Sequence, residues 1–216
     1  MAELLVVRHA QASFGADNYD ALSDLGHKQA AHLGAFLRRS GWQPDRLITG
    51  TLRRQHETLA SMGFDAAPEQ HPGWNEYDFH DLLAVRFGGT IPDDVRGDRR
   101  THFRTLRETI FEWQAGGLAG AREPWQEFTA RVADARRCAT RTTAERVLVI
   151  SSGGVIGQLV ADCLQAPPRQ MMQLNLQVKN TSMHRFIFSG DRFFLHEFNA
   201  TPHFASPEGA ALLTYS

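Results

Sequence analysis

The stretch LLVVRHAQ, residues 4–11, decides the fold more than any other part of the chain. Its first four residues are consecutive apolar side chains, a pattern typical of a short strand buried on both faces of a parallel sheet. Ligands in such sheets bind just beyond the carboxyl ends of the strands, and Arg8 and His9 stand at that end. An arginine suits a phosphate group, and a neutral imidazole can act as a nucleophile. The pair marks a candidate site, although buried strands also end in polar residues for solubility alone.

The chain downstream alternates predicted strands and helices. A second predicted buried strand, residues 146–151 with an apolar run at 147–150, leads through Ser152 and two glycines into a helix. The other predicted elements are a helix capped by Ser23 and stopped near Gly41, a strand at 47–49, a helix at 52–62, and a hairpin of 183–188 with 192–198. This order predicts a three-layer α/β/α sandwich with a mostly parallel sheet.

The middle of the chain, residues 81–144, is more polar than its surroundings. It carries helical patterns at 101–114 and 124–140, and we interpret it as a helical cap inserted into the core. A chain of 216 residues fits a single domain over residues 1–216 that includes such an insertion.

Charge and cysteine content narrow the partners and the compartment. The 23 basic and 24 acidic residues nearly cancel, so neither nucleic acid nor a membrane surface is an expected partner. No apolar run approaches the roughly 18 residues of a membrane span, and no basic leader precedes the first strand. Cys138 and Cys163 lack the spacing of a zinc site or a disulfide framework. Free thiols fit a reducing compartment, and the expected location is cytoplasmic.

Four blocks, taken together, make the chain resemble the histidine phosphatase superfamily, which is also called phosphoglycerate-mutase-like. Residues 5–11 resemble its Arg-His-Gly signature, with alanine in place of glycine. Residues 22–30 resemble its Leu-Thr/Ser-x-x-Gly-x-x-Gln-Ala helix start, and residues 51–58 its Leu-x-Arg-x-x-x-Thr block. Residues 74–79 resemble the acidic segment that supplies a proton donor. The resemblance covers most of the chain, and it rests on the order and spacing of the blocks.

A fifth block departs from the family pattern. The family carries a Ser-His-Gly-Gly-type turn after the second buried strand, and its histidine is the second catalytic imidazole. Here Ser152 occupies that place, followed by Gly153 and Gly154. The serine hydroxyl and the backbone N–H groups at the helix start can still bind an anion, but they supply no full positive charge. His203 and His80 are candidates to restore that charge; the alternative for His203 is a purely local hydrogen bond.

The resemblance implies a role for each matched residue. His9 is expected to attack phosphorus and form phosphohistidine, while Arg8 and Arg54 hold the phosphoryl oxygens. Glu76 is expected to protonate the leaving alcohol. No metal or cofactor is expected, because the arginines supply the positive charge.

Two of these assignments have rivals in the sequence. Arg53 lies beside Arg54, and the spacing of the block selects Arg54. Asp78 is the rival acid to Glu76. Gln11 is a further candidate for contact with the substrate. The only sign of this role is its position directly after the Arg-His-Ala signature.

The predicted function is a phosphomonoesterase that acts on a small phosphorylated metabolite, with activity reduced by the loss of the second histidine. One alternative is a phosphoglycerate mutase. The other is a degenerate protein that binds a phosphorylated ligand without turning it over. The edge of the C-terminal hairpin offers a surface for a homodimer, but such edges are commonly just protected.

Overall fold

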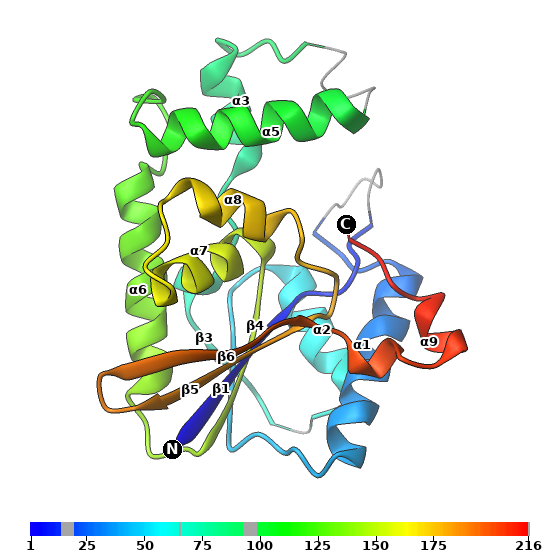
Figure 1. The fold of residues 1–216 in the computed structure, drawn as a ribbon. Coiled ribbons are helices and arrows are strands. Elements are labelled where there is room, and N and C mark those ends of the chain that lie inside the picture. The colour runs from blue at the N-terminus through cyan, green and yellow to red at the C-terminus, as the bar shows by residue number, and fades with distance from the viewer. Residues whose placement is uncertain (14–19, 65, 93–98, 216) are drawn as a thin grey trace.

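A computed structural model of the chain describes residues 1–13, 20–64, 66–92 and 99–215 (Figure 1). Over these residues one six-stranded sheet has the order β3-β2-β4-β1-β5-β6. The strands are β1 (Ala2–Arg8), β2 (Arg46–Thr49), β3 (Glu69–Gln70), β4 (Arg146–Ser151), β5 (Met183–Ser189) and β6 (Arg192–Ala200). The first four pair in parallel, whereas β5 and β6 form an antiparallel hairpin beside β1. The mostly parallel sheet and the hairpin are confirmed; the short strand β3, polar and exposed, gave no apolar signal in the sequence.

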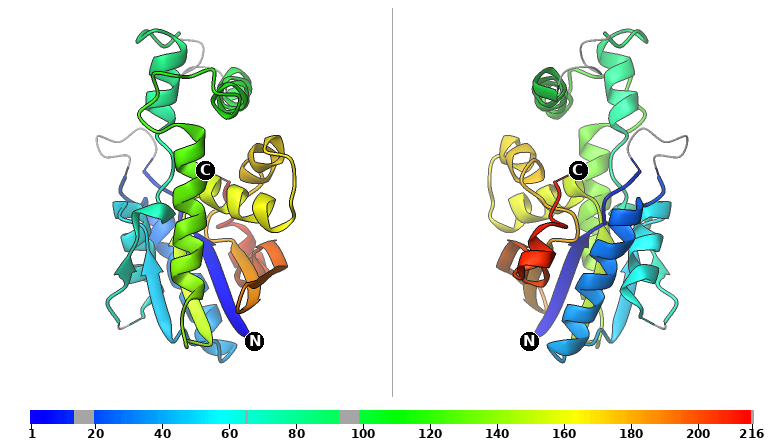
Figure 2. Two further views of the ribbon diagram at one scale, coloured as in Figure 1. Left: turned by 90° about the vertical axis from the view of Figure 1, so that its left-hand side faces the viewer. Right: turned by 90° about the vertical axis from the view of Figure 1, so that its right-hand side faces the viewer.

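Helices cover both faces of this sheet (Figure 2). One face carries α1 (Asp24–Arg39) and α2 (Arg53–Met62), and the other carries α6 (Trp125–Thr140) and α7 (Gly153–Cys163). The remaining helical segments are η1 (Pro72–Trp74), α3 (Phe79–Arg86), α5 (Arg99–Gln114), α8 (Arg169–Asn175), η2 (Pro202–Phe204) and α9 (Pro207–Ala210). The predicted α/β/α layering is therefore confirmed.

The two faces of β1 explain why its apolar run is continuous. Leu5 and Val7 belong to the core beneath α1 and α2, whereas Leu4 and Val6 belong to the core beneath α6 and α7. Successive side chains of a strand point to opposite faces, so a strand covered on both sides must be apolar at every position. All four side chains are fully buried.

Helix α1 begins as predicted at Ser23, whose hydroxyl accepts a hydrogen bond from the backbone N–H of Gly26 at 3.0 Å. The helix then crosses α2 very closely at Gly34, where an added Cβ would lie 2.0 Å from the carbonyl oxygen of Met62. This contact holds α1 close against the C-terminal end of α2.

Helices α3 and α5 pack together beyond the carboxyl ends of the parallel strands, at the top of Figure 1. Helix α6 runs along the molecule and packs on η1 and α7. Residues 93–98 of the predicted cap lie outside the described part of the chain, and the division into a core with a cap at 81–144 stays a prediction. Within the described residues, none of the helices combines the length and the hydropathy that a bilayer-spanning segment requires.

Candidate active site

His9 follows β1 directly, and its surroundings determine its tautomer. Its Nδ1 lies 2.8 Å from the carbonyl oxygen of Ala10, and its Nε2 lies 3.1 Å from Nε of Arg54. A carbonyl only accepts and a guanidinium only donates, so Nδ1 carries the proton and Nε2 offers a lone pair. Burial, followed by the charges of Arg54 and Arg8, lowers the pKa of His9 well below its ordinary value. His9 is therefore neutral, with an unprotonated Nε2 directed at a guanidinium.

Arg54, on the first turn of α2, is buried and held from two sides. Besides its contact with His9, its Nη1 forms an ion pair with Asp20 at 2.6 Å. Thr58 lies one turn further along α2; its hydroxyl donates to the carbonyl oxygen of Arg54 at 2.6 Å and accepts from the backbone N–H of Ala10 at 3.0 Å. This hydroxyl thus ties α2 to the backbone that carries His9.

Arg8 ends β1 beside His9 and is held by backbone carbonyls. Its Nη1 donates to the carbonyl oxygens of Val178 and, at 2.6 Å, of Tyr215. The nearby Asn180 donates from its amide to the carbonyl oxygen of His9 at 3.2 Å. Segments far apart in the chain therefore fix the Arg8-His9 pair.

Glu76 reaches the same site from the loop between η1 and α3. Its carboxylate accepts from the backbone N–H of Gly154 at 3.0 Å, at the first turn of α7, and from that of Tyr77 at 3.2 Å. Burial raises the pKa of Glu76, although these N–H groups and the charges of Arg54 and Arg8 oppose the rise. A carboxyl group that keeps its proton more readily than usual is suited to act as an acid.

Ser152 lies at the junction of β4 and α7 and is fully buried. The preceding residue, Ser151, pairs with Arg8 in the sheet, and its carbonyl oxygen accepts the backbone N–H of His9 at 2.9 Å. The Ser152 hydroxyl accepts a hydrogen bond from Nε2 of Gln55 at 3.0 Å. Gly153 follows it and begins α7, so the place predicted from the family turn lies next to His9.

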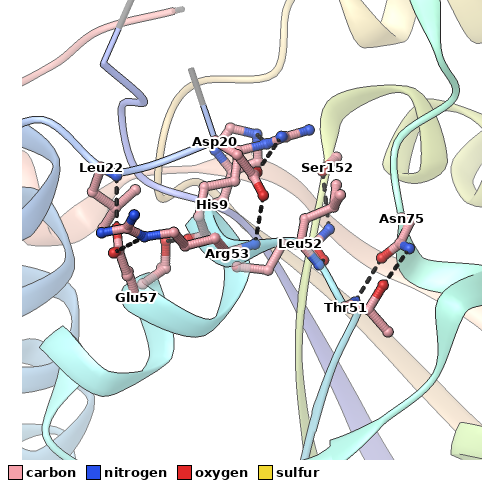
Figure 3. Close-up of polar contacts among 12 residues, drawn as sticks. His9, Asp20, Leu22, Thr51, Leu52, Arg53, Glu57, Asn75 and Ser152 are labelled. Carbon is pink, nitrogen blue, oxygen red and sulfur yellow. Dashed lines mark hydrogen bonds and ion pairs between the residues drawn. The ribbon is translucent and has the colours of Figure 1, made fainter. Parts of the chain in front are cut away.

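The structure separates the rival residues in the sequence. Arg53 points away from His9 into an exposed ion pair with Glu57 at 2.6 Å, and its backbone N–H donates to Asp20 (Figure 3). Asp78 is exposed and caps α3 by accepting from the backbone N–H of Asp81 at 3.0 Å. Of Arg53 and Arg54, the structure places Arg54 beside His9. Of Glu76 and Asp78, it places Glu76 at the N-terminus of α7, next to Ser152.

His203 is a buried residue of η2 whose hydrogen bond goes to Thr181, a residue distant in the chain, and not to a neighbouring group. Its Nε2 lies 3.0 Å from the hydroxyl of Thr181, and its ring packs against Phe204. Burial lowers the pKa of His203 to about 4, so the ring is uncharged at neutral pH and is not a source of positive charge for the site. The other candidate for that charge, His80, is exposed on α3.

Gln11 uses its side chain within the protein. Its Oε1 accepts from the hydroxyl of Ser23 at 2.9 Å, and its backbone N–H donates to Gln29 at 2.9 Å. These contacts join the segment after His9 to the start of α1.

Three residues that support the site were not predicted from the sequence. Asp20 orients Arg54, Gln55 contacts Ser152, and Asn180 holds the His9 backbone. The only sequence signal among them is Gln55, a polar residue that directly follows Arg54 within a matched block. No group of three or more histidine, cysteine or acidic side chains is placed to hold a metal ion, in the part of the chain that the structure describes.

Comparison with known families agrees with this geometry. Residues 4–201 match the model of the histidine phosphatase superfamily (branch 1), and the chain belongs to this family. No curated protein sequence matches the chain significantly.

Solved structures with the same fold cover nearly the whole chain. Bacillus stearothermophilus YhfR is 20% identical, with a TM-score of 0.70 and coverage of 94% of this chain and 99% of its own. A putative alpha-ribazole-5'-P phosphatase from Escherichia coli is 20% identical, with a TM-score of 0.67 and coverages of 93% and 98%. A phosphoglycerate mutase from Bacillus anthracis is 18% identical, with a TM-score of 0.67 and a coverage of 94% of both chains. At these identities the likeness shows the fold alone.

Proposed function

We propose that this protein is a phosphomonoesterase that hydrolyses a small phosphorylated metabolite through a phosphohistidine intermediate on His9. The observation that carries this proposal is the environment of the His9 ring. Nδ1 is hydrogen-bonded to a carbonyl, and Nε2 is unprotonated and faces the Arg54 guanidinium, a group suited to bind phosphate. A histidine in a purely structural role has no need of a lone pair aimed at a buried cation.

In the first step the Nε2 lone pair of His9 attacks phosphorus, and the bond from phosphorus to the leaving oxygen breaks. The carboxyl group of Glu76 gives its proton to that oxygen, so the product leaves as an alcohol. Arg54 and Arg8 stabilise the charge on the phosphoryl oxygens, where it spreads in the transition state.

In the second step water attacks the phosphorus of phosphohistidine, and the Glu76 carboxylate takes a proton from that water. The phosphorus–nitrogen bond breaks, its electron pair returns to Nε2, and inorganic phosphate leaves. Both side chains are then restored to their starting protonation states.

Ser152 and Gly153 complete the proposed phosphate site with a hydroxyl and a backbone N–H. They replace a charged imidazole with neutral donors, and loss of one strong electrostatic stabiliser typically costs about a hundred- to a thousandfold in rate. We therefore expect a slow phosphatase. The loss of the second histidine also counts against a phosphoglycerate mutase, which needs a stable phosphoenzyme and a site that excludes water.

The small size of the substrate stays a prediction from the sequence. A cavity of about 270 Å³ adjoins Glu76, but its lining, which includes Tyr77 and Trp113, does not include His9 or Arg54. A cytoplasmic location and a homodimer through the edge strand β6 stay predictions from the sequence.

The test is phosphate release from an aryl phosphate and from a panel of sugar and glycerate phosphates, by the wild type and His9→Ala. Release by the wild type alone, with an acid-labile phosphoenzyme after rapid quenching, is the expected result. Equal rates for the two proteins would overturn the proposal. Saturable binding of a phosphorylated ligand without release would instead identify a phosphate-binding protein, and turnover of 3-phosphoglycerate primed by 2,3-bisphosphoglycerate would identify a mutase.

A further inference from the structure

Gln55 is a fully buried side chain on α2 whose hydrogen-bonding groups are all used. Its Nε2 donates to the carbonyl oxygen of Trp74 at 2.9 Å and to the hydroxyl of Ser152 at 3.0 Å. Its Oε1 accepts, at 3.4 Å, from the backbone N–H of Leu52. These partners fix the orientation of the amide, because a carbonyl needs a donor and a backbone N–H needs an acceptor.

The chain makes room for this amide. A Cβ at Gly50 would lie 2.1 Å from Oε1 of Gln55 and 2.4 Å from Oδ1 of Asn75, so any larger residue at position 50 would displace both side chains. Asn75 is itself held by paired hydrogen bonds with Thr51, which Figure 3 shows. The position of the Gln55 amide is therefore built into the loop between β2 and α2.

The hydrogen bond from Gln55 determines what the Ser152 hydroxyl can do. A serine hydroxyl has one proton and two lone pairs, and Gln55 occupies a lone pair. Within the described residues Gln55 is the only hydrogen-bonding partner of this hydroxyl, so its proton remains available. A hydroxyl that accepts one hydrogen bond is also a stronger donor in the next.

We propose that Gln55 is a positioning residue that makes the Ser152 hydroxyl a directed hydrogen-bond donor to the phosphoryl group on His9. This inference rests on the proposed phosphatase function. Gln55 and Ser152 together thus occupy the place of the family's second histidine with a neutral pair. The donor is weaker than an imidazolium, but it carries no charge that changes with pH.

The test uses Gln55→Glu, which keeps the shape and removes the donor. A carboxylate only accepts hydrogen bonds. It would therefore accept one from the Ser152 hydroxyl, which would turn the hydroxyl proton away from the phosphoryl group. We expect kcat/KM to fall by about ten- to a hundredfold at a pH where the new carboxyl is ionised. The loss should shrink as pH falls and this carboxyl regains a proton. His9 and Glu76 titrate in both proteins, so the ratio of wild-type to variant rates isolates the introduced group.

A double-mutant cycle distinguishes positioning from a structural role. In a Ser152→Ala background, Gln55→Glu should cost no further activity, because the hydroxyl it redirects is absent. The inference would be overturned if the losses of activity from Gln55→Glu and Ser152→Ala multiply in the double variant. It would also be overturned if the ratio of wild-type to Gln55→Glu rates is independent of pH. Gln55→Met serves as a second variant if the glutamate destabilises the fold: it should lower kcat/KM severalfold in the wild type and not at all in Ser152→Ala.

Ser151→Ala is the matched control. Ser151 is equally buried and adjacent, and its hydroxyl donates at 2.9 Å to the carbonyl oxygen of Trp74, which also accepts from Gln55. The control therefore removes a neighbouring hydroxyl of the same network while the Gln55–Ser152 hydrogen bond stays. We expect this variant to retain activity while Ser152→Ala loses it. If wild type and His9→Ala release phosphate equally, the phosphatase function itself falls. If phosphate release depends on His9 but the Gln55–Ser152 cycle is additive, only the role of Gln55 is refuted.

Discussion

Glu76 and Asp78 lie two residues apart and have opposite environments. Burial raises the pKa of Glu76, whereas Asp78 is exposed and is engaged as the cap of α3. Only a group that still carries its proton can serve as the acid in the first step, and a raised pKa extends the pH range in which it does so. The two carboxylates therefore form a natural pair of test and control.

The Glu76→Gln variant should discriminate between leaving groups. We expect kcat/KM for an alkyl phosphate to fall by about a hundredfold or more, and for an aryl phosphate to fall much less, because a phenolate leaves without a proton. In the wild type the rate on alkyl phosphates should decline as pH rises through the pKa of Glu76, and in the variant this decline should disappear. Steady-state kinetics on both substrates between pH 4 and about 9 measure both effects.

Asp78→Asn is the control for that experiment. It removes a neighbouring charge and weakens the cap of α3, but it should preserve both the ranking of the substrates and the pH profile. If Asp78→Asn rather than Glu76→Gln selectively impaired alkyl phosphates, the proton donor would have to be reassigned to Asp78.

The Ser152→His variant tests the departure from the family pattern directly. Ser152 is fully buried, and Nε2 of Gln55 lies 3.0 Å from its hydroxyl, so an imidazole at this position meets the Gln55 amide. We expect Ser152→His alone to be no faster than wild type. The double variant Ser152→His/Gln55→Ala frees the volume, and kcat should rise by about tenfold or more as a charged stabiliser returns. If Ser152→His alone is as fast as Ser152→His/Gln55→Ala, the Gln55 side chain does not hinder an imidazole at position 152.

At this scale the sequence predicted His9, Arg54 and Glu76, because each belongs to a matched block with fixed spacing. It did not predict Asp20 or Asn180. Both act through partners more than 30 residues away in the chain, Arg54 and His9, and no local pattern encodes such a contact.

The N-terminus of α7 is the element on which Glu76 depends. The carboxylate accepts from the backbone N–H of Gly154, and an added Cβ there would lie 2.3 Å from both Oε1 of Glu76 and Cε1 of Tyr77. The absence of a side chain at this position, rather than backbone freedom, is what allows the acid to approach the helix end. The positive end of the helix dipole also stabilises an anion at this place.

Gly154→Ala should therefore displace the proton donor. We expect kcat/KM for alkyl phosphates to fall by about tenfold or more, with a smaller effect on aryl phosphates, as for Glu76→Gln. Gly120→Ala is a suitable control, because its added Cβ meets only Val85 at 3.5 Å, an ordinary contact. Kinetics and thermal unfolding of both variants measure the effect, and an equal loss on both substrates would indicate general disruption of the site.

Most elements were predictable because each carries a strong local signal. The continuous apolar runs of β1 and β4 and the cap of α1 at Ser23 are examples, and all three are confirmed. Residues 178–182, by contrast, form a turn with Thr181 at a φ of 56°, a backbone conformation that β-branched residues rarely adopt. Its shape follows from tertiary contacts with Arg8, His9 and His203, which a sequence window does not contain.

The assembled molecule places a third uncharged histidine, His184, behind the site. His184, on β5, is fully buried; its Nδ1 accepts from the backbone N–H of Asn199 at 3.2 Å, and its Nε2 lies 3.0 Å from the hydroxyl of Ser182. The Ser182 hydroxyl donates to the carbonyl oxygen of Lys179 at 2.7 Å. The ring thus supports the turn at residues 178–182, which holds Arg8 and His9.

This arrangement predicts how the free energy of unfolding depends on pH. Burial, and then the charge of Arg8, lowers the pKa of His184 from 6.5 to about 3. The unfolded chain binds a proton at this residue below pH 6.5 and the folded protein does not, so its contribution is complete above pH 6.5 and is lost as pH falls towards 3. From these values His184 alone should cost about 2 kcal/mol of stability between pH 7 and pH 5.

Urea unfolding of the wild type and His184→Gln at both pH values measures this contribution. The variant should be less stable than the wild type at pH 7 and should lose about 2 kcal/mol less on acidification. His203 titrates in both proteins, so the difference between them isolates His184, and His196→Gln, which alters an exposed ring on β6, should behave as wild type. An equal loss in His184→Gln and the wild type would mean that acid destabilises the molecule elsewhere. A reduced loss would show that protonation of the buried His184 ring opposes folding, as its lowered pKa predicts.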